Sequence, residues 1–276
     1  MISIIEILKT ILFGIVEGIT EWLPISSTGH MILLNEFVKL DVSEEFWEMF
    51  LVVIQLGAIL AVVLLFWNKI FPFRCKEKPV IRIDIFVLWF KILVACIPAA
   101  VIGLAFDDVF DALFYNPTCV AVALIVFGIA FIVIENRNRN MSPKITELQQ
   151  ITFQTAFMIG VFQLLAAVFP GTSRSGATIV GALLIGVSRT VAAEFTFFLA
   201  IPVMLGASLL KIVKFGFDFT GAELTILLVG MVSAFVVSVV VIRFLMGYIK
   251  KHDFKVFGWY RIILGAAVLL YFTLAA

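Results

Sequence analysis

Long apolar runs alternate with short polar connections along most of the chain. A helix needs about 20 mainly apolar residues to cross the ~30 Å hydrocarbon core of a bilayer. Three runs meet this requirement without an internal charge, and three others are shorter or contain one charged residue. The pattern therefore predicts six transmembrane helices, over residues 49–67, 85–106, 112–134, 195–210, 224–242 and 256–276.

Two further segments, residues 4–39 and 148–187, do not match an ordinary span. Each contains a proline, Pro24 or Pro170, that is followed by a stretch rich in hydroxyl side chains. Non-helical backbone at membrane depth is tolerated only where it is buried in protein or lines a wet cavity. We therefore predict that each segment is a re-entrant helical hairpin, in which two short helices are broken at the proline.

The two segments also match each other at a constant, ungapped offset of 146 residues. A unit of one hairpin and three spans crosses the membrane an odd number of times, so a second copy would be inverted relative to the first. We predict one membrane domain over residues 1–276, built from an inverted repeat of residues 1–138 and 139–276. The matched pairs are Gly14 and Gly160, Glu17 and Gln163, Pro24 and Pro170, Ser26 and Thr172, and Ser27 and Ser173.

The composition agrees with this pattern, because 63% of the residues are hydrophobic and only 14% are charged. Soluble domains have roughly 45–50% apolar and about 25% charged residues. The predicted class is an all-α polytopic membrane protein. The first six residues lack the basic region and cleavage site of a signal peptide, so we expect them in the mature fold. Cys75, Cys96 and Cys119 have no metal-ligand spacing, and no functional thiol is expected.

The charged residues of the connections are sorted by sign. Lys and Arg gather at residues 69–82, 136–147 and 243–255, whereas the alternating connections are acidic or mixed, and one of them contains Asp107, Asp108 and Asp111. The positive-inside rule makes the basic connections cytoplasmic, which puts both termini on the outer side. The net charge of +1 does not indicate a partner. We expect contact with membrane lipids and none with nucleic acid, and the oligomeric state, including a homodimer, stays open.

Glu17 and Glu21 are spaced four residues apart and so share one helix face. Each charge at the bilayer centre costs about 2.5–3.5 kcal/mol on the gentler insertion scale. The pair therefore needs a cation, either a divalent metal such as Mg²⁺ or Ca²⁺ or the side chain of Arg174. In the alternative interpretation, one glutamate is protonated or reaches the interface and packs beside Gly14 and Gly18, which form a GxxxG contact face.

The hydroxyl-rich stretches after Pro24 and Pro170 are placed where helix N-caps are expected. Two helix N-termini that face each other would form an anion site, and phosphate is its usual occupant. In the simpler interpretation, the hydroxyls only satisfy backbone groups that the breaks leave free. The candidate substrate-binding residues are Ser26, Thr28, Gln163, Gly171, Thr172 and Ser173.

His30 lies three residues after Ser27, about one helical turn along the same face. It is expected to reach the serine hydroxyl and deprotonate it, or to attack phosphorus itself. A lone histidine can also be a hydrogen-bonded core residue. Arg174 would supply a planar, permanently charged fork for phosphate oxygens.

These residues carry a family resemblance. The sequence EGITEWLPISSTGH at residues 17–30 and the sequence PGTSRSGAT at residues 170–178 closely resemble the two signatures of the undecaprenyl pyrophosphate phosphatase family, also called bacitracin resistance proteins. The resemblance implies a hydrolase of the bacterial cytoplasmic membrane that converts undecaprenyl pyrophosphate to the monophosphate that carries cell-wall precursors. It also implies a divalent cation and catalysis on the outer, periplasmic side. The essential residues would be Glu17, Glu21, Ser27, His30 and Arg174.

Two hypotheses from different classes follow. In the first, the pyrophosphate binds a metal at Glu17 and Glu21 together with Arg174, and Ser27, activated by His30, attacks the terminal phosphorus. In a close variant His30 is the nucleophile. In the second, the chain is a transporter or flippase for an anionic lipid, because inverted repeats and broken helices are common in transporters. The broad family of lipid phosphatases that uses a second histidine is disfavoured, because no second intramembrane histidine is present.

Overall fold

The computed structural model describes residues 2–73, 80–114 and 116–275, without the side chains of residues 104, 107, 108, 111 and 275. This part of the chain is built from helices, with two isolated β-bridges as its only strand-like pairing. The helices are α1 (Ile4–Thr20), α2 (Ser27–Phe37), α3 (Glu44–Val53), α4 (Gln55–Leu65), α5 (Trp67–Ile70), α6 (Ile83–Phe114), α7 (Pro117–Asn138), the 3₁₀ helix η1 (Leu148–Gln150), α8 (Phe153–Val168), α9 (Arg174–Leu184), α10 (Arg189–Phe215), α11 (Gly221–Tyr248) and α12 (Lys255–Ala275).

Six helical segments are long and apolar enough to cross a membrane, which confirms the predicted number of candidate spans. They are Glu44–Leu65, Ile83–Gly103, Pro117–Asn138, Arg189–Phe215, Gly221–Tyr248 and Lys255–Leu274. The predicted third span, residues 112–134, was placed wrongly at its start. Its first residues belong to α6, and α7 begins only after Asn116, whose side chain accepts a hydrogen bond from the backbone N–H of Cys119 at 2.9 Å. An Asn cap followed by Pro117 at the first helical position is a strong start signal.

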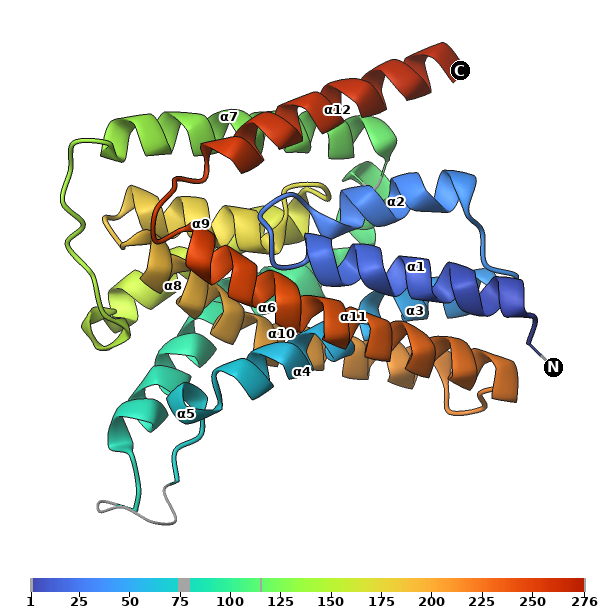
Figure 1. Cartoon of the computed structure of the whole chain (residues 1–276), viewed down its shortest axis with the longest axis horizontal. Helices are drawn as coiled ribbons and strands as arrows, with labels where there is room; N and C mark the ends of the chain where they lie inside the picture. Colours follow the sequence, from blue (N-terminus) through green and yellow to red (C-terminus); the bar gives the residue numbers. More distant parts are fainter. Residues whose placement is uncertain (1, 74–79, 115, 276) are drawn as a thin grey trace.

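The helices of the two predicted repeats pack against each other. In Figure 1, α12 lies along α7 and α1 lies along α11, and α8 packs along α6. Small residues permit this close approach, because Gly14 and Gly18 of α1 lie against the backbone of α11 and Gly160 of α8 lies against Ala95 of α6. The predicted contact face at Gly14 and Gly18 is therefore present in the structure.

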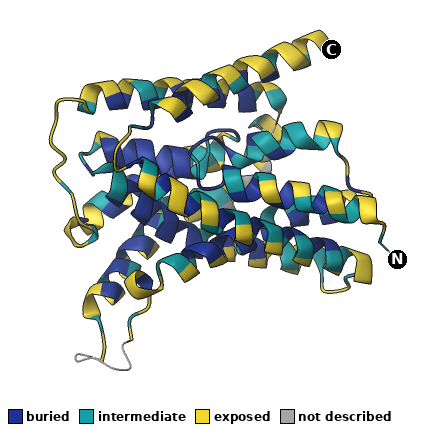
Figure 2. Cartoon of the chain, in the orientation of Figure 1, coloured by how far each residue is buried: buried dark blue, intermediate teal, exposed yellow. Residues whose placement is uncertain are grey.

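The interior is most fully enclosed around α9 and the first half of α10. Residues 175–183 of α9 are all buried, whereas only Gly29 and Met31 are buried in α2 (Figure 2). The outward positions of α6, α11 and α12 carry exposed apolar side chains. An apolar outer surface over long helices is what a lipid environment requires.

The connections are distributed as the charge pattern requires. Residues 139–147 and the turn between α11 and α12 lie at one end of the molecule, and both termini lie at the other (Figure 1). The basic residues Arg74, Lys76 and Lys78 and the thiol of Cys75 lie outside the described residues, as do the side chains of Asp107, Asp108 and Asp111. The prediction for these positions is therefore untested.

The close contact at Gly160 gives a stability prediction. A Cβ there would overlap the carbonyl group of Ala95, so Gly160→Ala should lower the thermal midpoint of the detergent-solubilised protein, with a cost of about 1–3 kcal/mol for overpacking. Gly206→Ala is the matched control, because a Cβ at Gly206 meets no atom within 4 Å. The control should leave the midpoint unchanged or raise it, since Ala favours helix more than Gly. Equal midpoints for the two variants would contradict the assigned packing.

Candidate active site

Two helices of the site begin at serine caps with the same unusual backbone. Ser26 and Ser173 have φ of 75° and 70°, and no other described residue except glycine has a positive φ. Their hydroxyls accept hydrogen bonds from the backbone N–H of Gly29 at 3.3 Å and of Gly176 at 3.2 Å. Non-glycine residues in this region cost about 1–3 kcal/mol and cluster at functional sites.

The paired caps correct the ungapped alignment. Ser26 matches Ser173 and not Thr172, so the offset becomes 147 after the prolines. The reason is that two residues lie between Pro170 and its cap Ser173, whereas one lies between Pro24 and its cap Ser26. Helices α2 and α9 have the same length of 11 residues, and their first residues are Ser27 and Arg174.

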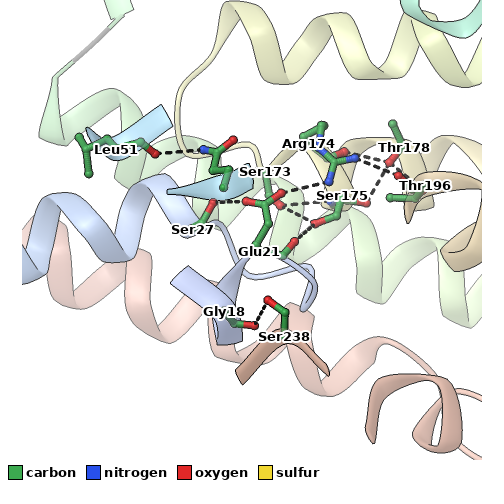
Figure 3. Close-up of polar contacts among 12 residues, drawn as sticks. Gly18, Glu21, Ser27, Leu51, Ser173, Arg174, Ser175, Thr178, Thr196 and Ser238 are labelled. Carbon is green, nitrogen blue, oxygen red and sulfur yellow. Dashed lines mark hydrogen bonds and ion pairs between the residues drawn. The ribbon is translucent and has the colours of Figure 1, made fainter. Parts of the chain in front are cut away.

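Glu21 joins the two helix starts. Its Oε2 accepts a hydrogen bond from Ser27 Oγ at 2.7 Å, and its Oε1 accepts one from Arg174 Nη2 at 3.0 Å. Its backbone carbonyl accepts a third from Ser175 Oγ at 3.2 Å. Figure 3 shows the Glu21 carboxylate between Ser27 and Arg174. The Glu21 and Arg174 side chains are 6% and 13% exposed, so this ion pair lies largely out of solvent.

Helix α10 holds Arg174 from the other side. Arg174 Nη1 donates to the backbone carbonyl of Thr196 at 3.0 Å. The Thr196 hydroxyl donates to Thr178 Oγ1 at 2.9 Å, and Thr178 in turn donates to the carbonyl of Arg174 at 2.9 Å. Thr196 was not among the predicted site residues, because an isolated threonine in an apolar span carries no local signal.

Several buried polar atoms in this region have no hydrogen-bond partner within the described part of the protein. They are Oε1 of Glu17, Nε1 of Trp22, both side-chain polar atoms of Gln163, Oγ1 of Thr172 and Nε of Arg174. Buried polar groups are hydrogen-bonded in the great majority of cases, so each such atom calls for a ligand or water. Acceptor oxygens, N–H donors and a hydroxyl of this kind match a ligand that carries both a cation and phosphate oxygens.

In the described part of the chain the His30 ring forms no hydrogen bond with the Ser27 hydroxyl, contrary to the sequence-based expectation. Its Nδ1 is 2.7 Å from the carbonyl oxygen of Ser26, and its Nε2 is 2.7 Å from the hydroxyl of Tyr260. A carbonyl only accepts, so in the neutral ring Nδ1 carries the proton and Nε2 accepts from Tyr260. The two rings are nearly parallel, at 4° with centroids 5.6 Å apart. The cap geometry of Ser26 explains the difference, because it places its carbonyl one turn before His30.

Arg261 is the one charged residue within the predicted span 256–276, and it was not among the predicted site residues. The side chain is fully buried, and its guanidinium donates to the carbonyl oxygens of Pro24 at 3.2 Å, Gly171 at 3.0 Å, Thr172 at 2.8 Å and Leu124 at 3.4 Å. It therefore ties both proline-broken loops to α12 and α7. An ionisable residue within a transmembrane span is by default a candidate functional residue, and that signal was available.

A cavity of about 440 Å³ opens beside the first loop. Glu17, Ser27 and Thr28 line its inner part, and Glu48 and Lys211, which pair at 3.3 Å, line it where side chains are exposed. His30, Arg174, Gln163 and the residues 171–173 are not part of its lining. The structure thus brings Glu21, Ser27 and Arg174 together and places Glu17 and Thr28 at the adjoining cavity.

The described residues contain no cluster of three or more His, Cys, Asp or Glu side chains suited to a metal. A divalent cation at this site would therefore rely on Glu17 and Glu21 alone among such residues. The unpartnered Oε1 of Glu17 fits this role. Mg²⁺ in particular is often held by one or two carboxylates, with waters and substrate phosphates as its other ligands.

The fold and the site together define a multi-pass membrane protein with a buried polar centre between two broken helical segments. The family model of bacitracin resistance protein BacA matches residues 10–267. The undecaprenyl-diphosphatase of Desulfitobacterium hafniense is 70% identical over 271 residues, which cover 98% of each chain. Those of Enterococcus faecalis and Streptococcus thermophilus are 65% and 56% identical, over 98% and 97% of this chain and 98% and 94% of the relatives. This chain belongs to the BacA family of bacterial membrane proteins.

The bonds of Arg261 lead to a second stability prediction. Arg261→Lys keeps the positive charge, but one ammonium group cannot reach the carbonyls of both loops, so the thermal midpoint should fall. Each lost hydrogen bond to a charged group contributes about 1.5–3 kcal/mol. Arg243→Lys, at an exposed position, is the control and should melt like the wild type. If Arg261→Lys had the same thermal midpoint as the control, the bonds of the Arg261 guanidinium to the two proline-broken loops would not contribute to stability.

Proposed function

We propose that this chain is an integral membrane phosphatase that hydrolyses undecaprenyl pyrophosphate to undecaprenyl phosphate and inorganic phosphate. The relatives named above are undecaprenyl-diphosphatases and match nearly the whole chain. The observation that carries the proposal is the bridge from the Ser27 hydroxyl through the Glu21 carboxylate to Arg174. It combines a nucleophile, a proton acceptor and a phosphate-binding cation at two helix starts.

The chemistry follows from these contacts. The terminal phosphate lies between the N-termini of α2 and α9, where free backbone N–H groups and the unpartnered Nε of Arg174 bind its oxygens. Ser27 Oγ attacks the terminal phosphorus while its proton passes to Glu21, and the anhydride P–O bond breaks. Undecaprenyl phosphate leaves, and water then hydrolyses the phosphoserine. Arg174 stabilises the charge that develops on the transferred phosphoryl group.

His30 has a different place in this scheme from the one expected. Both of its nitrogens are engaged, by the Ser26 carbonyl and the Tyr260 hydroxyl, so Glu21 is the better base for Ser27. His30 keeps the loop in position and remains the alternative nucleophile, which requires that Nε2 leave Tyr260. A Mg²⁺ or Ca²⁺ ion at Glu17 and Glu21 would neutralise pyrophosphate oxygens when bound.

The proposal includes the finer architecture. We place α1 with α2 and α8 with α9 as re-entrant hairpins of two inverted repeats, residues 1–138 and 139–276. The reciprocal packing of α1 on α11 and of α8 on α6 supports this arrangement. Ser26, Thr28, Gly171, Thr172, Ser173 and Gln163 surround the substrate phosphates.

The site opens to the outer, periplasmic side in this proposal. Glu48 lies in the first turns of α3 and Lys211 in the last turns of α10, at the ends opposite the basic connections. These two residues line the cavity that reaches Glu17 and Ser27.

A transporter or flippase of an anionic lipid is the second candidate. The observation that favours it is a second ion pair, between Lys69 and Glu194 at 2.7 Å, which lies near the start of α10, whereas the pair of Glu48 and Lys211 lies near its end. An ion pair at each end of such a fold could break and form alternately as the site opens to one membrane face and then to the other.

A phosphate-release assay tests the proposed function. Purified protein in detergent should release phosphate from an isoprenyl pyrophosphate, should stop after addition of a chelator, and should recover with Mg²⁺ or Ca²⁺. Glu21→Gln should lower kcat by roughly 10²–10⁴-fold, because it removes the proton acceptor of Ser27.

Glu45→Gln is the control for this assay, since Glu45 is exposed and lies outside the site. A wild-type protein that binds the pyrophosphate but releases no phosphate would refute the phosphatase and leave the transporter. Full activity in the chelator would remove the metal from the proposal.

The covalent intermediate distinguishes the two nucleophiles. Because Ser27 Oγ is bonded to Glu21, the trapped phosphoenzyme should survive acid and be cleaved by base, as phosphoserine is, and should be absent from Ser27→Ala. Ser142→Ala changes an exposed hydroxyl outside the site and is the control. An acid-labile, base-stable adduct that disappears in His30→Gln would instead assign the attack to the imidazole.

A further inference from the structure

We propose that a second cavity, centred on Lys91, binds a phosphate monoester. It has a volume of about 390 Å³ and lies between the start of α6, residues 146–149 and the start of α10. None of the residues of the Glu21 bridge lines it. It lies at the end of the molecule that carries the basic connections, and the proposal holds whether or not the chain is a phosphatase.

Lys91 is the group that requires a ligand. It belongs to a candidate membrane span, is 9% exposed, and lines the cavity. Its Nζ donates one hydrogen bond, to the backbone carbonyl of Gln149 at 3.2 Å, and it has no carboxylate partner within the described part of the chain. An ammonium group has three donors, so two remain for an anion. A buried charge without a counter-ion is costly, which favours occupation of the cavity by one.

The other charged side chains of the cavity are already compensated. Lys69 donates to both carboxylate oxygens of Glu194, at 2.7 and 2.8 Å, and Arg82 pairs with Asp84 at 2.6 Å. The remaining acid, Glu147, is exposed and caps η1. Lys91 is therefore the one buried cation of the lining that has no carboxylate partner among the described residues.

The lining also indicates the size and class of the ligand. Besides Lys91, the hydroxyl of Thr190 can donate to an anion, and the salt-bridged Lys69 and Arg82 have further N–H groups that can do so. Ile85, Leu88, Leu148 and Val191 give the cavity apolar walls. A tetrahedral anion with several acceptor oxygens and an apolar substituent satisfies both features. The shared chemistry is that of inorganic phosphate and of a lipid monophosphate headgroup.

Binding measurements can separate this cavity from the first site. In protein that carries Arg174→Gln, which weakens the first site, we expect farnesyl phosphate to bind still, as followed by isothermal titration calorimetry in detergent. Adding Lys91→Met should weaken that binding by roughly tenfold or more, because a charge-assisted hydrogen bond is lost. Lys214→Met, at an exposed position of α10, is the matched control and should leave the affinity unchanged.

Two further measurements fix the outcome. Inorganic phosphate, titrated in parallel, distinguishes a free anion from a lipid headgroup: equal affinity would assign the cavity to phosphate alone, and tighter farnesyl phosphate to the lipid. If Lys91→Met does not fold, Arg82→Gln, which changes a half-buried lining residue, should still weaken the binding, by a smaller factor. The proposal is overturned if Arg174→Gln protein binds neither probe, or if both cavity variants bind as the Lys214→Met control does.

Discussion

The structure depends on how two interruptions of helical backbone are satisfied inside an apolar protein. At each proline break, carbonyl and N–H groups lose their helical partners and cannot turn to water. One buried guanidinium, that of Arg261, takes up the carbonyls of both loops. The backbone N–H groups at each break donate instead to the serine caps, and the N–H groups that remain free are available to a ligand between the two helix starts. The bonds that complete the fold at the two breaks therefore also position the two helix starts between which the proposed phosphate would bind.

The Glu21 carboxylate has a second structural role, which is to satisfy charged and polar side chains of the site. It compensates Arg174 in a largely buried setting and at the same time accepts the hydrogen bond of Ser27. A buried pair that loses one member costs about 3–5 kcal/mol, since the remaining charge is left uncompensated. Separating Glu21 from Arg174 is therefore costly, and a phosphate that binds Arg174 must compete with or rearrange around this pair.

Much of this organisation could be predicted from the sequence, because it depends on local rules. Span length, charge sorting and the proline breaks are read from composition within a short window, and the number of candidate spans was right. Long-range contacts of single side chains could not be predicted. Tyr260 reaches His30, and Arg261 reaches Pro24, across more than 200 positions of the chain. The boundary between α6 and α7 was missed because the apolar pattern outweighed the Asn116 cap signal.

The equivalence of Ser27 and Arg174 has a consequence for how such a site can change. Both are the first residue of an 11-residue helix that follows a strained serine cap, so the two copies of the proposed repeat offer the same geometric position to the proposed nucleophile and to a cation. A duplicated site with identical residues at both positions would have either two hydroxyls or two charges, and neither combination can both attack and stabilise. The proposed chemistry therefore requires that the two copies carry different residues at this position, and joining them in one chain fixes which copy supplies the hydroxyl and which supplies the cation.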